Sequence, residues 1–302
     1  MRIGVELGGP ETDVLVLGND GATVRRERAP TATARYEDIL ETVKSLVTLV
    51  EVGATERGTV GVSLPGAISA KTGRVKNSNN ANLLGADLAG DLNRLLERDV
   101  RIGNDANCFA LAEATDGAAA GAGVVLGLIL GAGVGAGIAV DRRIVEGANA
   151  VAGEIGHNPL PWSSDEESSR VRCYCGRSGC IEQFLSLSGL QRAYKNRTGL
   201  YVSADEILRN AGAKQAEAIA CLAEYGDRLA RVIGSLVNVL DPDTIVLGGT
   251  LAKSAVDYAA LPEAVARYAF SDRLDTKFVQ AAHGDAAGVR GAAMLWSVEG
   301  SG

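Results

Sequence analysis

Apolar residues gather in short runs, and one arrangement of these runs occurs twice in the chain. In residues 3–17 and again in residues 126–140, two apolar runs flank a glycine-rich turn, at 8–10 and at 131–135. Runs rich in valine, isoleucine and leucine that glycines interrupt are typical of a β-hairpin. The repetition therefore predicts two lobes, each of which begins with a glycine-tipped hairpin.

Segments with helical spacing follow the first hairpin. Apolar residues recur every three or four positions over 39–50, and Gly53 ends this segment, which predicts a helix. A strand at 59–64, a helix near 87–97 and a short strand ending at Asn104 complete the pattern. Strands that alternate with helices predict an α/β lobe.

The later part of the chain shows a second alternation. Residues 219–240 keep one apolar face of a long helix, which ends before Pro242 because proline cannot continue a helix. A strand at 244–247 runs into two glycines, and a final helix begins near Gly288. The length of 302 residues exceeds the roughly 100–200 residues of a usual domain, which also predicts two lobes.

Charge and composition narrow the class of protein. Lysine and arginine number 30 against 37 acidic residues, so the net charge is −7, without a basic cluster, which argues against nucleic-acid binding. No apolar stretch reaches the roughly 20 residues of a membrane span. The first residues also lack the layout of a signal peptide. We therefore expect a soluble, cytoplasmic protein that does not bind membranes.

Three of the five cysteines crowd between positions 173 and 180. With a histidine that fifteen intervening residues separate from the first of them, they form the set His157, Cys173, Cys175 and Cys180. One imidazole and three thiolates are the closed ligand set of structural zinc, whereas a catalytic zinc keeps an open position. The alternative is that the cysteines are incidental, but the glycines of C-x-C-G-x-x-G-C let a short loop wrap a metal. We predict a structural zinc site.

Three motifs resemble those of the ROK family of bacterial sugar kinases and repressors. They are residues 102–108 (IGNDANC), 153–157 (GEIGH) and 173–182 (CYCGRSGCIE). The resemblance covers essentially the whole chain and is closest to bacterial fructokinases and mannofructokinases, as in residues 75–79 and 283–293. The N-terminal helix-turn-helix of the repressors has no counterpart ahead of the first strand, so we expect an enzyme.

The resemblance implies an α/β fold of two actin-like ATPase lobes, of ribonuclease H-like type, with the active site in the cleft. It also implies that the last helix crosses back to the first lobe. The expected lobes are residues 1–117 plus 289–302, and residues 118–288 with the zinc loop and the adenosine site. Family members are commonly dimers, so we expect a homodimer.

Asp105 stands where the family has its catalytic base, which accepts the proton of the sugar hydroxyl as the phosphoryl group arrives. On its own, Asp105 could equally be the N-cap of the helix that follows. The resemblance implies a sugar-binding set of Gly66, Asn79, Asn104, Asp105, Glu154, His157 and Glu182. Carboxylates and amides suit sugar hydroxyls because each can make several hydrogen bonds. One ring nitrogen of His157 would bind zinc while the other faces the sugar.

In the family, two glycine-rich hairpins approach the phosphates of ATP, an acidic residue helps to hold magnesium, and a later loop contacts adenosine. The residues at these positions are Glu6, Gly8, Gly9, Gly131, Gly133, Gly135, Gly248 and Gly249. Pro10 and Ala132 replace family threonines, and Glu11 replaces a lysine. A hydrogen bond to a charged group contributes about 1.5–3 kcal/mol, so two lost hydroxyls would weaken ATP binding or rate by about two to four decades.

These features predict an ATP- and magnesium-dependent hexose 6-kinase of the fructokinase type, acting on fructose or mannose. The altered phosphate side leaves a second hypothesis open, a sugar-binding pseudokinase or sensor without ATP turnover. A third is a glycoside hydrolase on the same scaffold, with Asp105 and either Glu154 or Glu6 as an acid–base pair.

Overall fold

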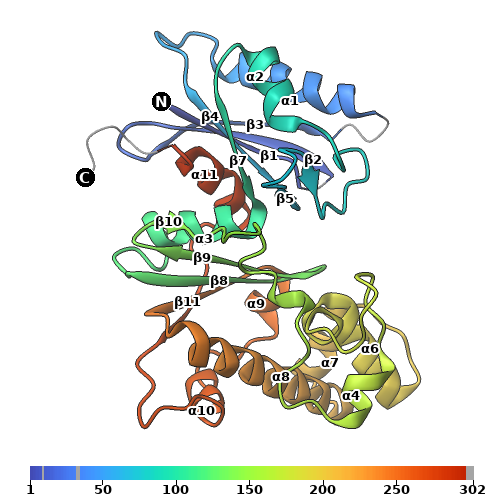
Figure 1. Cartoon of the computed structure of the whole chain (residues 1–302). Coiled ribbons are helices and arrows are strands. Elements are labelled where there is room, and N and C mark those ends of the chain that lie inside the picture. The colour runs from blue at the N-terminus through green and yellow to red at the C-terminus, as the bar shows by residue number, and fades with distance from the viewer. Residues whose placement is uncertain (9, 32–34, 297–302) are drawn as a thin grey trace. The chain divides into compact units, whose positions relative to one another are not determined.

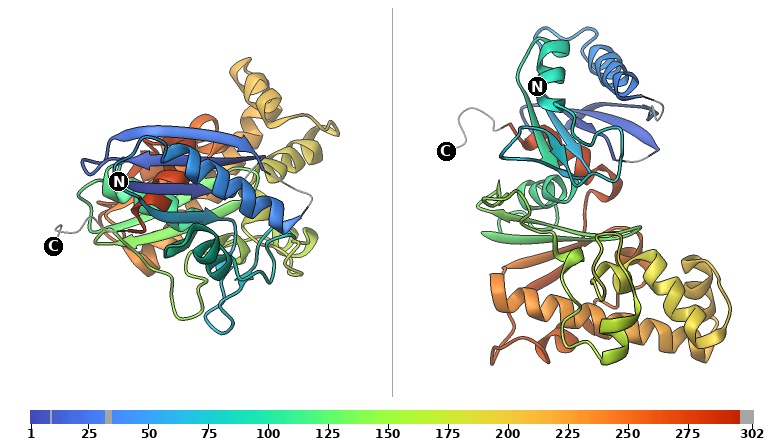
Figure 2. Two further views of the ribbon diagram at one scale, coloured as in Figure 1. Left: turned by 90° about the horizontal axis from the view of Figure 1, so that it is seen from above. Right: turned by 45° about the vertical axis from the view of Figure 1, so that its right-hand side comes forward.

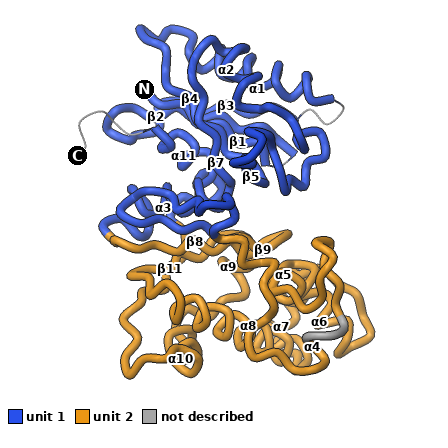
Figure 3. The backbone as a smooth tube through the Cα atoms, in the orientation of Figure 1, with its two compact units in different colours: residues 1–121, 137–152, 282–302 blue, residues 122–136, 153–281 orange. Residues whose placement is uncertain are grey.

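The computed structural model describes residues 1–8, 10–31 and 35–296, without the side chains of 168–170 (Figure 1). Two compact units divide the chain (Figure 3). The first comprises Met1–Gly121, Gly137–Ala152 and the residues from 282 on, and the second comprises Ala122–Ala136 and Gly153–Ala281. The second lobe expected from the sequence contains all of residues 118–288, whereas residues 118–121, 137–152 and 282–288 belong to the first unit. The functions assigned to the two lobes are still a prediction.

A five-stranded sheet forms the centre of the first unit. Its strands are β1 (Arg2–Glu6), β2 (Glu11–Leu17), β3 (Thr23–Pro30), β4 (Thr59–Leu64) and β7 (Val100–Asn104), in the order β3-β2-β1-β4-β7. The pairs β1–β2 and β2–β3 are antiparallel, and β1, β4 and β7 run parallel. Ile3, Val14 and Val62 are fully buried in its core, because these strands carry valine, isoleucine and leucine where helices cover the sheet.

Helices cover both faces of this sheet (Figure 1). α1 (Tyr36–Val50) and α2 (Leu88–Leu96) lie on one face, and α11 (Ala287–Met294) packs on β1, on β4 and against α3 (Asp105–Thr115). This packing requires glycine: a Cβ on Gly4 would lie 1.9 Å from the Val289 carbonyl oxygen, and one on Gly61 would lie 1.9 Å from that of Ala292. The last helix therefore belongs to the first unit, as the family resemblance implies.

A second sheet has the same strand order as the first. It joins β8 (Val124–Leu130), β9 (Val134–Val140), β10 (Arg143–Ile144), β11 (Thr244–Gly248) and β12 (Lys277–Gln280) in the order β10-β9-β8-β11-β12. In the second unit, α6 (Leu187–Thr198), α7 (Ala204–Gly212) and α10 (Leu261–Ala266) pack against the long α8 (Ala216–Leu240) (Figure 2). The repeated order confirms an α/β fold built on two related sheets.

Most expected elements lie within a few residues of the observed ones. The helix expected over 39–50 begins at Tyr36, and β9 begins at Val134, so the second hairpin has a shorter turn than 131–135. β3 is not predicted, because its alternating arginines and glutamates give an edge strand no apolar run. Among the helices that the structure describes, none combines the length and the apolar character that crossing a membrane needs.

Candidate active site

Asp105 opens helix α3 directly after strand β7. The cap of this helix is Asn104, whose side-chain oxygen accepts hydrogen bonds from the backbone N–H groups of Ala106 (2.9 Å) and Asn107 (3.2 Å). Asp105 is therefore the first helical residue, and the capping role considered for it falls to its neighbour. Its Oδ1 accepts a 2.8 Å hydrogen bond from the Ala106 N–H. The N-terminus of the helix favours the negative charge of Asp105.

In the first unit, the carboxylates of Asp13 and Asp105 act electrostatically on the carboxyl group of Glu6. Glu6 and Asp13 are paired across β1 and β2. Burial, followed by the charges of Asp105 and Asp13, raises the pKa of Glu6 to about 7. Like charges held together in this way favour a bound cation, and carboxylate oxygens are ligands that Mg²⁺ prefers. These residues therefore could hold a magnesium ion.

Asp13 is already paired with two arginines of the edge strand β3. Its buried carboxylate accepts hydrogen bonds from Arg26 Nε at 3.1 Å and from Arg28 Nε at 3.0 Å. Arg28 also lies 4.0 Å from Glu11 and 3.2 Å from Asp285. Glu11 thus has a cation beside it, which partly offsets the reversed charge at this position. Neither arginine is predicted from the sequence, because β3 has no apolar run to mark it as a strand.

The first glycine hairpin is described in part. Gly8 follows β1, and Gly9 lies outside the described residues. Pro10 is exposed, and its carbonyl accepts the Thr31 N–H at 2.8 Å, which extends the pairing of β2 with β3. Proline has no backbone N–H, so Pro10 cannot donate a backbone hydrogen bond to a phosphate. Its carbonyl oxygen is used within the sheet.

The second glycine hairpin closes with a tight turn between β8 and β9. The Gly131 N–H donates to the Gly133 carbonyl at 3.0 Å, and Ala132 is exposed at the tip. Glu182 reaches this turn: its Oε2 accepts the Val134 N–H at 3.2 Å, and a Cβ on Gly133 would lie 2.8 Å from the same oxygen. Glu182, predicted for the sugar side, thus also holds the phosphate-side turn in place.

Two glycines connect β11 to α9 (Thr250–Ser254). Gly248 ends the strand, and Gly249 has a φ of +87°, where a Cβ would lie 2.3 Å from the Leu130 carbonyl oxygen. Only glycine fits both the left-handed backbone and this close approach. The glycines expected beside adenosine therefore lie next to the end of β8, which leads into the phosphate-side turn. Gly135 lies inside β9.

The predicted zinc ligands meet in the second unit. Nδ1 of His157 lies 3.6 Å from Sγ of Cys173, and Sγ of Cys175 lies 3.6 Å from Sγ of Cys180. All four donor atoms lie within 4.8 Å of one another. Zinc–sulfur bonds of about 2.3 Å and zinc–nitrogen bonds of about 2.0 Å place neighbouring ligands of a tetrahedron roughly 3.5–3.8 Å apart. The cluster is therefore compatible with a structural zinc ion.

The loop around these ligands depends on its glycines. Gly176 and Gly179 have φ values of +88° and +73°, which favour glycine, and the Cys173 N–H donates to the Arg177 carbonyl at 2.8 Å. The backbone N–H of Arg177 lowers the pKa of the Cys175 thiol. A lower pKa favours the thiolate, which is the form that binds metal.

Tyr174 is a residue that the sequence analysis missed. Its hydroxyl lies 3.0 Å from Nε2 of His157, and the two rings meet edge to face at 5.1 Å. The family resemblance implies that this nitrogen faces the sugar, whereas in the structure it contacts Tyr174. Burial, followed by the charge of Glu182, raises the pKa of Tyr174 to about 12. The only sequence signal for Tyr174 is its position between two cysteine ligands.

The remaining sugar-side residues fall into two groups. In the first unit, Asn104 Nδ2 donates to the Gly66 carbonyl at 3.0 Å, which holds Gly66 beside the start of α3. Gly66 has a φ of +121°, and a Cβ there would lie 2.7 Å from the Lys76 carbonyl oxygen. Asn79 is exposed, three residues after β6 (Val75–Lys76), which pairs with β5 (Ala67–Ile68).

In the second unit, Glu154 immediately precedes the short 3-10 helix η1 (Ile155–His157). Its backbone carbonyl accepts the His157 N–H at 3.3 Å. Glu154 and Glu182 both act electrostatically on Tyr174, which bonds to His157. Tyr174 therefore contacts His157 and lies within electrostatic reach of Glu154 and Glu182.

The chain is similar to known proteins over nearly its whole length. The chain matches the model of the ROK family over residues 2–299. An N-acetyl-D-glucosamine kinase of Yersinia enterocolitica is 36% identical over 299 residues, which are 98% of this chain and 99% of that protein. A kinase of the same name from Pectobacterium atrosepticum is 36% identical over 299 residues, 98% of each chain.

A solved structure is similar over almost the whole chain. The ROK hexokinase from Thermus thermophilus superposes with a TM-score of 0.88 at 27% identity and covers 99% of this chain and 98% of its own. With a family match and curated relatives that both span nearly every residue, the chain belongs to the ROK family, among its sugar kinases.

Proposed function

We propose that this enzyme transfers the γ-phosphoryl group of ATP to the 6-hydroxyl group of a hexose. The main support is the group of Glu6, Asp13 and Asp105. Asp105, at the start of a helix, is placed as a carboxylate base, and Glu6, on which its charge acts, is an acidic residue suited to Mg²⁺. N-acetyl-D-glucosamine is the first sugar to consider, since relatives at 35–36% identity bear that name. Fructose and mannose, which the sequence motifs suggest, come next.

Asp105 is the proposed base. Its carboxylate accepts the proton of the 6-hydroxyl as that oxygen forms its bond to phosphorus. The N-terminus of α3 stabilises negative charge on Asp105. When bound, Mg²⁺ would neutralise charge on the phosphates. Glu6 is its proposed ligand, because Arg26 and Arg28 already engage Asp13.

Sugar recognition is assigned to the residues expected from the sequence: Gly66, Asn79, Asn104, Asp105, Glu154, His157 and Glu182. We assign a structural role to zinc, because the closed set of four ligands would brace the loop that carries His157. Tyr174 would share or give up its hydrogen bond to Nε2 of His157 when a sugar binds. In keeping with the family resemblance, we also propose a cytoplasmic homodimer.

One alternative has an observation in its favour. Pro10 has no N–H and Ala132 no hydroxyl, so a protein that binds sugar without turning over ATP would explain both residues. Arg28 beside Glu11 counts against this alternative, because it keeps positive charge near the first hairpin. A glycoside hydrolase would need only the acidic pair of Glu6 and Asp105.

The test is an assay of ADP release by zinc-loaded protein with ATP and Mg²⁺. N-acetyl-D-glucosamine, fructose, mannose and glucose are compared by kcat/KM. We expect turnover with a clear preference for one sugar. If no sugar is phosphorylated while calorimetry detects sugar binding, the sugar-binding alternative replaces the kinase. Release of reducing sugar from a glycoside without ATP would instead support a hydrolase.

A further inference from the structure

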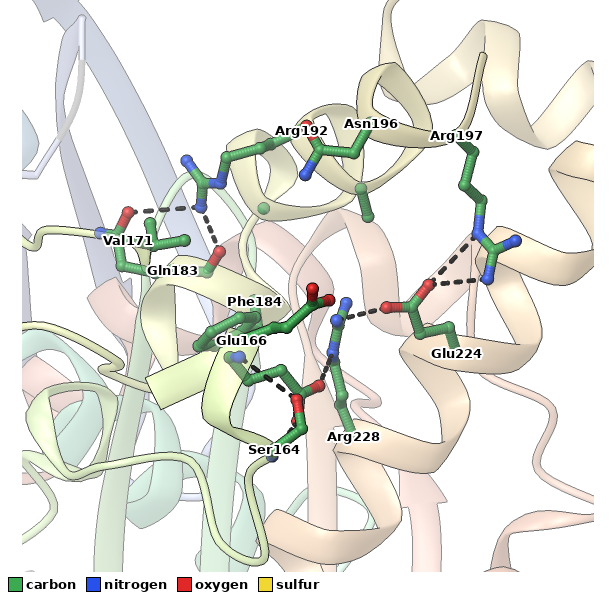
Figure 4. A pocket seen from close by; sticks show the side chains of 13 residues that line it. Ser164, Glu166, Val171, Gln183, Phe184, Arg192, Asn196, Arg197, Glu224 and Arg228 are labelled. Atoms are coloured by element: carbon green, nitrogen blue, oxygen red, sulfur yellow. Dashed lines mark hydrogen bonds and ion pairs between the residues drawn. The ribbon is translucent and has the colours of Figure 1, made fainter. Parts of the chain in front are cut away.

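The second unit contains a cavity of about 800 Å³ whose residues the proposed reaction does not use. It lies among α4 (Asp165–Arg170), α5 (Glu182–Leu185), α6 and α8 (Figure 4). Its walls are mainly charged and polar side chains, and none of them belongs to the sugar, nucleotide or zinc set. Cavities of this size accommodate small organic ligands. We call it the Arg192 pocket.

Most charges that line the Arg192 pocket are paired within the protein. Glu167 accepts from Arg228 at 2.8 Å, and Arg231 lies 3.0 Å from the same oxygen. Glu224 pairs with Arg197 at 3.1 Å and with Arg228. Figure 4 shows Glu224 of α8 between Arg197 of α6 and Arg228 of α8. These ion pairs leave little net charge among the paired residues.

Arg192 is different, because no carboxylate of the described residues lies within ion-pair distance of its guanidinium group. In the described part of the chain its one hydrogen-bond partner is Gln183, through the backbone carbonyl and, at 3.3 Å, the side-chain oxygen. Burial, followed by the positive charge of Arg228, lowers the pKa of Arg192. A partly buried cation without a counter-ion is unfavourable, and an anion in the cavity would stabilise it.

The groups around Arg192 suit the rest of a sugar phosphate. Asn196 follows one turn later on α6 and also lines the cavity, as does Glu166 from α4 (Figure 4). An amide can both donate to and accept from hydroxyls, and a carboxylate accepts from them. The small residues Gly189 and Ala193 leave room beside the guanidinium group.

We propose that the Arg192 pocket is a second ligand site, which binds a small phosphorylated sugar through the guanidinium group of Arg192. The choice of sugar phosphate rests on the proposed function, because the product of that reaction belongs to this class. The site also touches both flanks of the zinc loop. Gln183 directly follows Glu182, and Val171, which also lines the cavity, lies two residues before Cys173. A ligand that draws Arg192 away from Gln183 would therefore act on the segment that carries Glu182.

The test is calorimetric titration of the zinc-loaded protein with N-acetylglucosamine 6-phosphate, alone and with saturating N-acetyl-D-glucosamine. Glucose 6-phosphate and inorganic phosphate serve as further probes. We expect a site that excess sugar does not remove. Arg192→Gln, which removes the charge, should weaken this site at least roughly tenfold. Ala193→Leu, which fills the cavity and keeps the arginine, should do the same. The exposed Arg209→Gln makes the same charge change as a control and should leave the site intact.

The outcomes separate this proposal from the proposed function. Sugar-phosphate binding that survives excess sugar and disappears in both pocket variants supports the site, whether or not the protein turns over ATP. Binding that excess sugar removes completely overturns it, as does a second site that neither variant weakens. Equal binding of inorganic phosphate and of both sugar phosphates overturns the assignment to sugars, because hydroxyl contacts would then contribute nothing.

Discussion

Asp105 and Glu6 illustrate how neighbouring groups decide what a carboxylate can do. Asn104 caps α3, so Asp105 is left at the helix start, where its charged form is favoured. Glu6 is partly buried near like charges, and its pKa rises to about 7. The first environment suits a proton acceptor, and the second suits a ligand that gives up a proton when a cation binds.

Asp105→Asn tests the base. Asparagine keeps the size of the side chain and its acceptor for the Ala106 N–H, so the helix start should stay intact. Loss of a general base typically costs 10²–10⁴-fold, so we expect kcat to fall by about that factor while sugar KM changes little. Steady-state ADP release measures both. A variant with more than a tenth of the wild-type kcat would show that Asp105 is not the base.

Glu6→Gln tests the acidic group through stability. The folded protein keeps a proton on Glu6 that the unfolded chain, with a pKa of 4.5, has lost, so stability falls as pH rises from about 4.5 to about 7. The fall amounts to at most about 3 kcal/mol. Glutamine does not titrate, so without added magnesium the variant should be more stable than the wild type at pH 8. Urea unfolding at pH 5 and pH 8 measures this, and equal pH dependence of the two proteins would contradict it.

In the zinc loop, which carries Cys173, Cys175 and Cys180, the geometry is compatible with the metal site predicted from the sequence. Its two left-handed glycines and four converging donors fit the spacing that first suggested a metal. The role of Tyr174 could not be predicted, because which ring nitrogen it contacts depends on how the loop folds around His157.

Cys175→Ala tests the metal. We expect about one zinc per chain in the wild type and much less in the variant, because a closed site loses one of four ligands. The variant should also melt at a lower temperature and bind sugar more weakly. Cys221→Ala, which removes a buried thiol outside the cluster, is the control and should keep its zinc. Elemental analysis decides: full zinc in Cys175→Ala, or none in the wild type, would refute the site.

The two glycine hairpins are where this chain departs from its family. A triple change, Pro10→Thr, Glu11→Lys and Ala132→Thr, restores the family residues. Two recovered hydroxyl contacts should raise kcat/KM for ATP by about two to four decades. Glu11→Lys alone should gain much less, because it sets a lysine beside Arg28. ATP titrations at fixed sugar measure the gain. An unchanged triple variant would mean that the backbone alone carries the phosphate contacts.

The elements that could be predicted are those with a strong local signal. The glycine hairpins, α1, α8 and the strand before Gly248 follow from apolar spacing and from turn residues. β3 could not be predicted, because its charges alternate on an edge strand and depend on pairing with β2. Arg26 and Arg28 were missed with it, although they set the electrostatics around Asp13 and Glu11.

Over the whole chain, the positions assigned to sugar and to zinc match the family motifs. Some of the positions assigned to phosphate differ from them. The relatives that match nearly every residue support a kinase. Under the proposed assignment, Pro10 and Ala132 would affect how well ATP is held, and the sugar-side residues would affect which sugar is phosphorylated. Nucleotide use and sugar recognition can therefore be tested separately, by varying the nucleotide and by varying the sugar.

Transfer of labelled phosphate from the γ-position of ATP to N-acetyl-D-glucosamine tests the kinase most directly. The measurement uses zinc-loaded wild-type protein with Mg²⁺, beside Asp105→Asn. We predict labelled sugar 6-phosphate in the wild type, at a rate at least about 10²-fold above that of the variant. No labelled product with this sugar, fructose, mannose or glucose, at saturating ATP, would contradict the assignment of a hexose kinase.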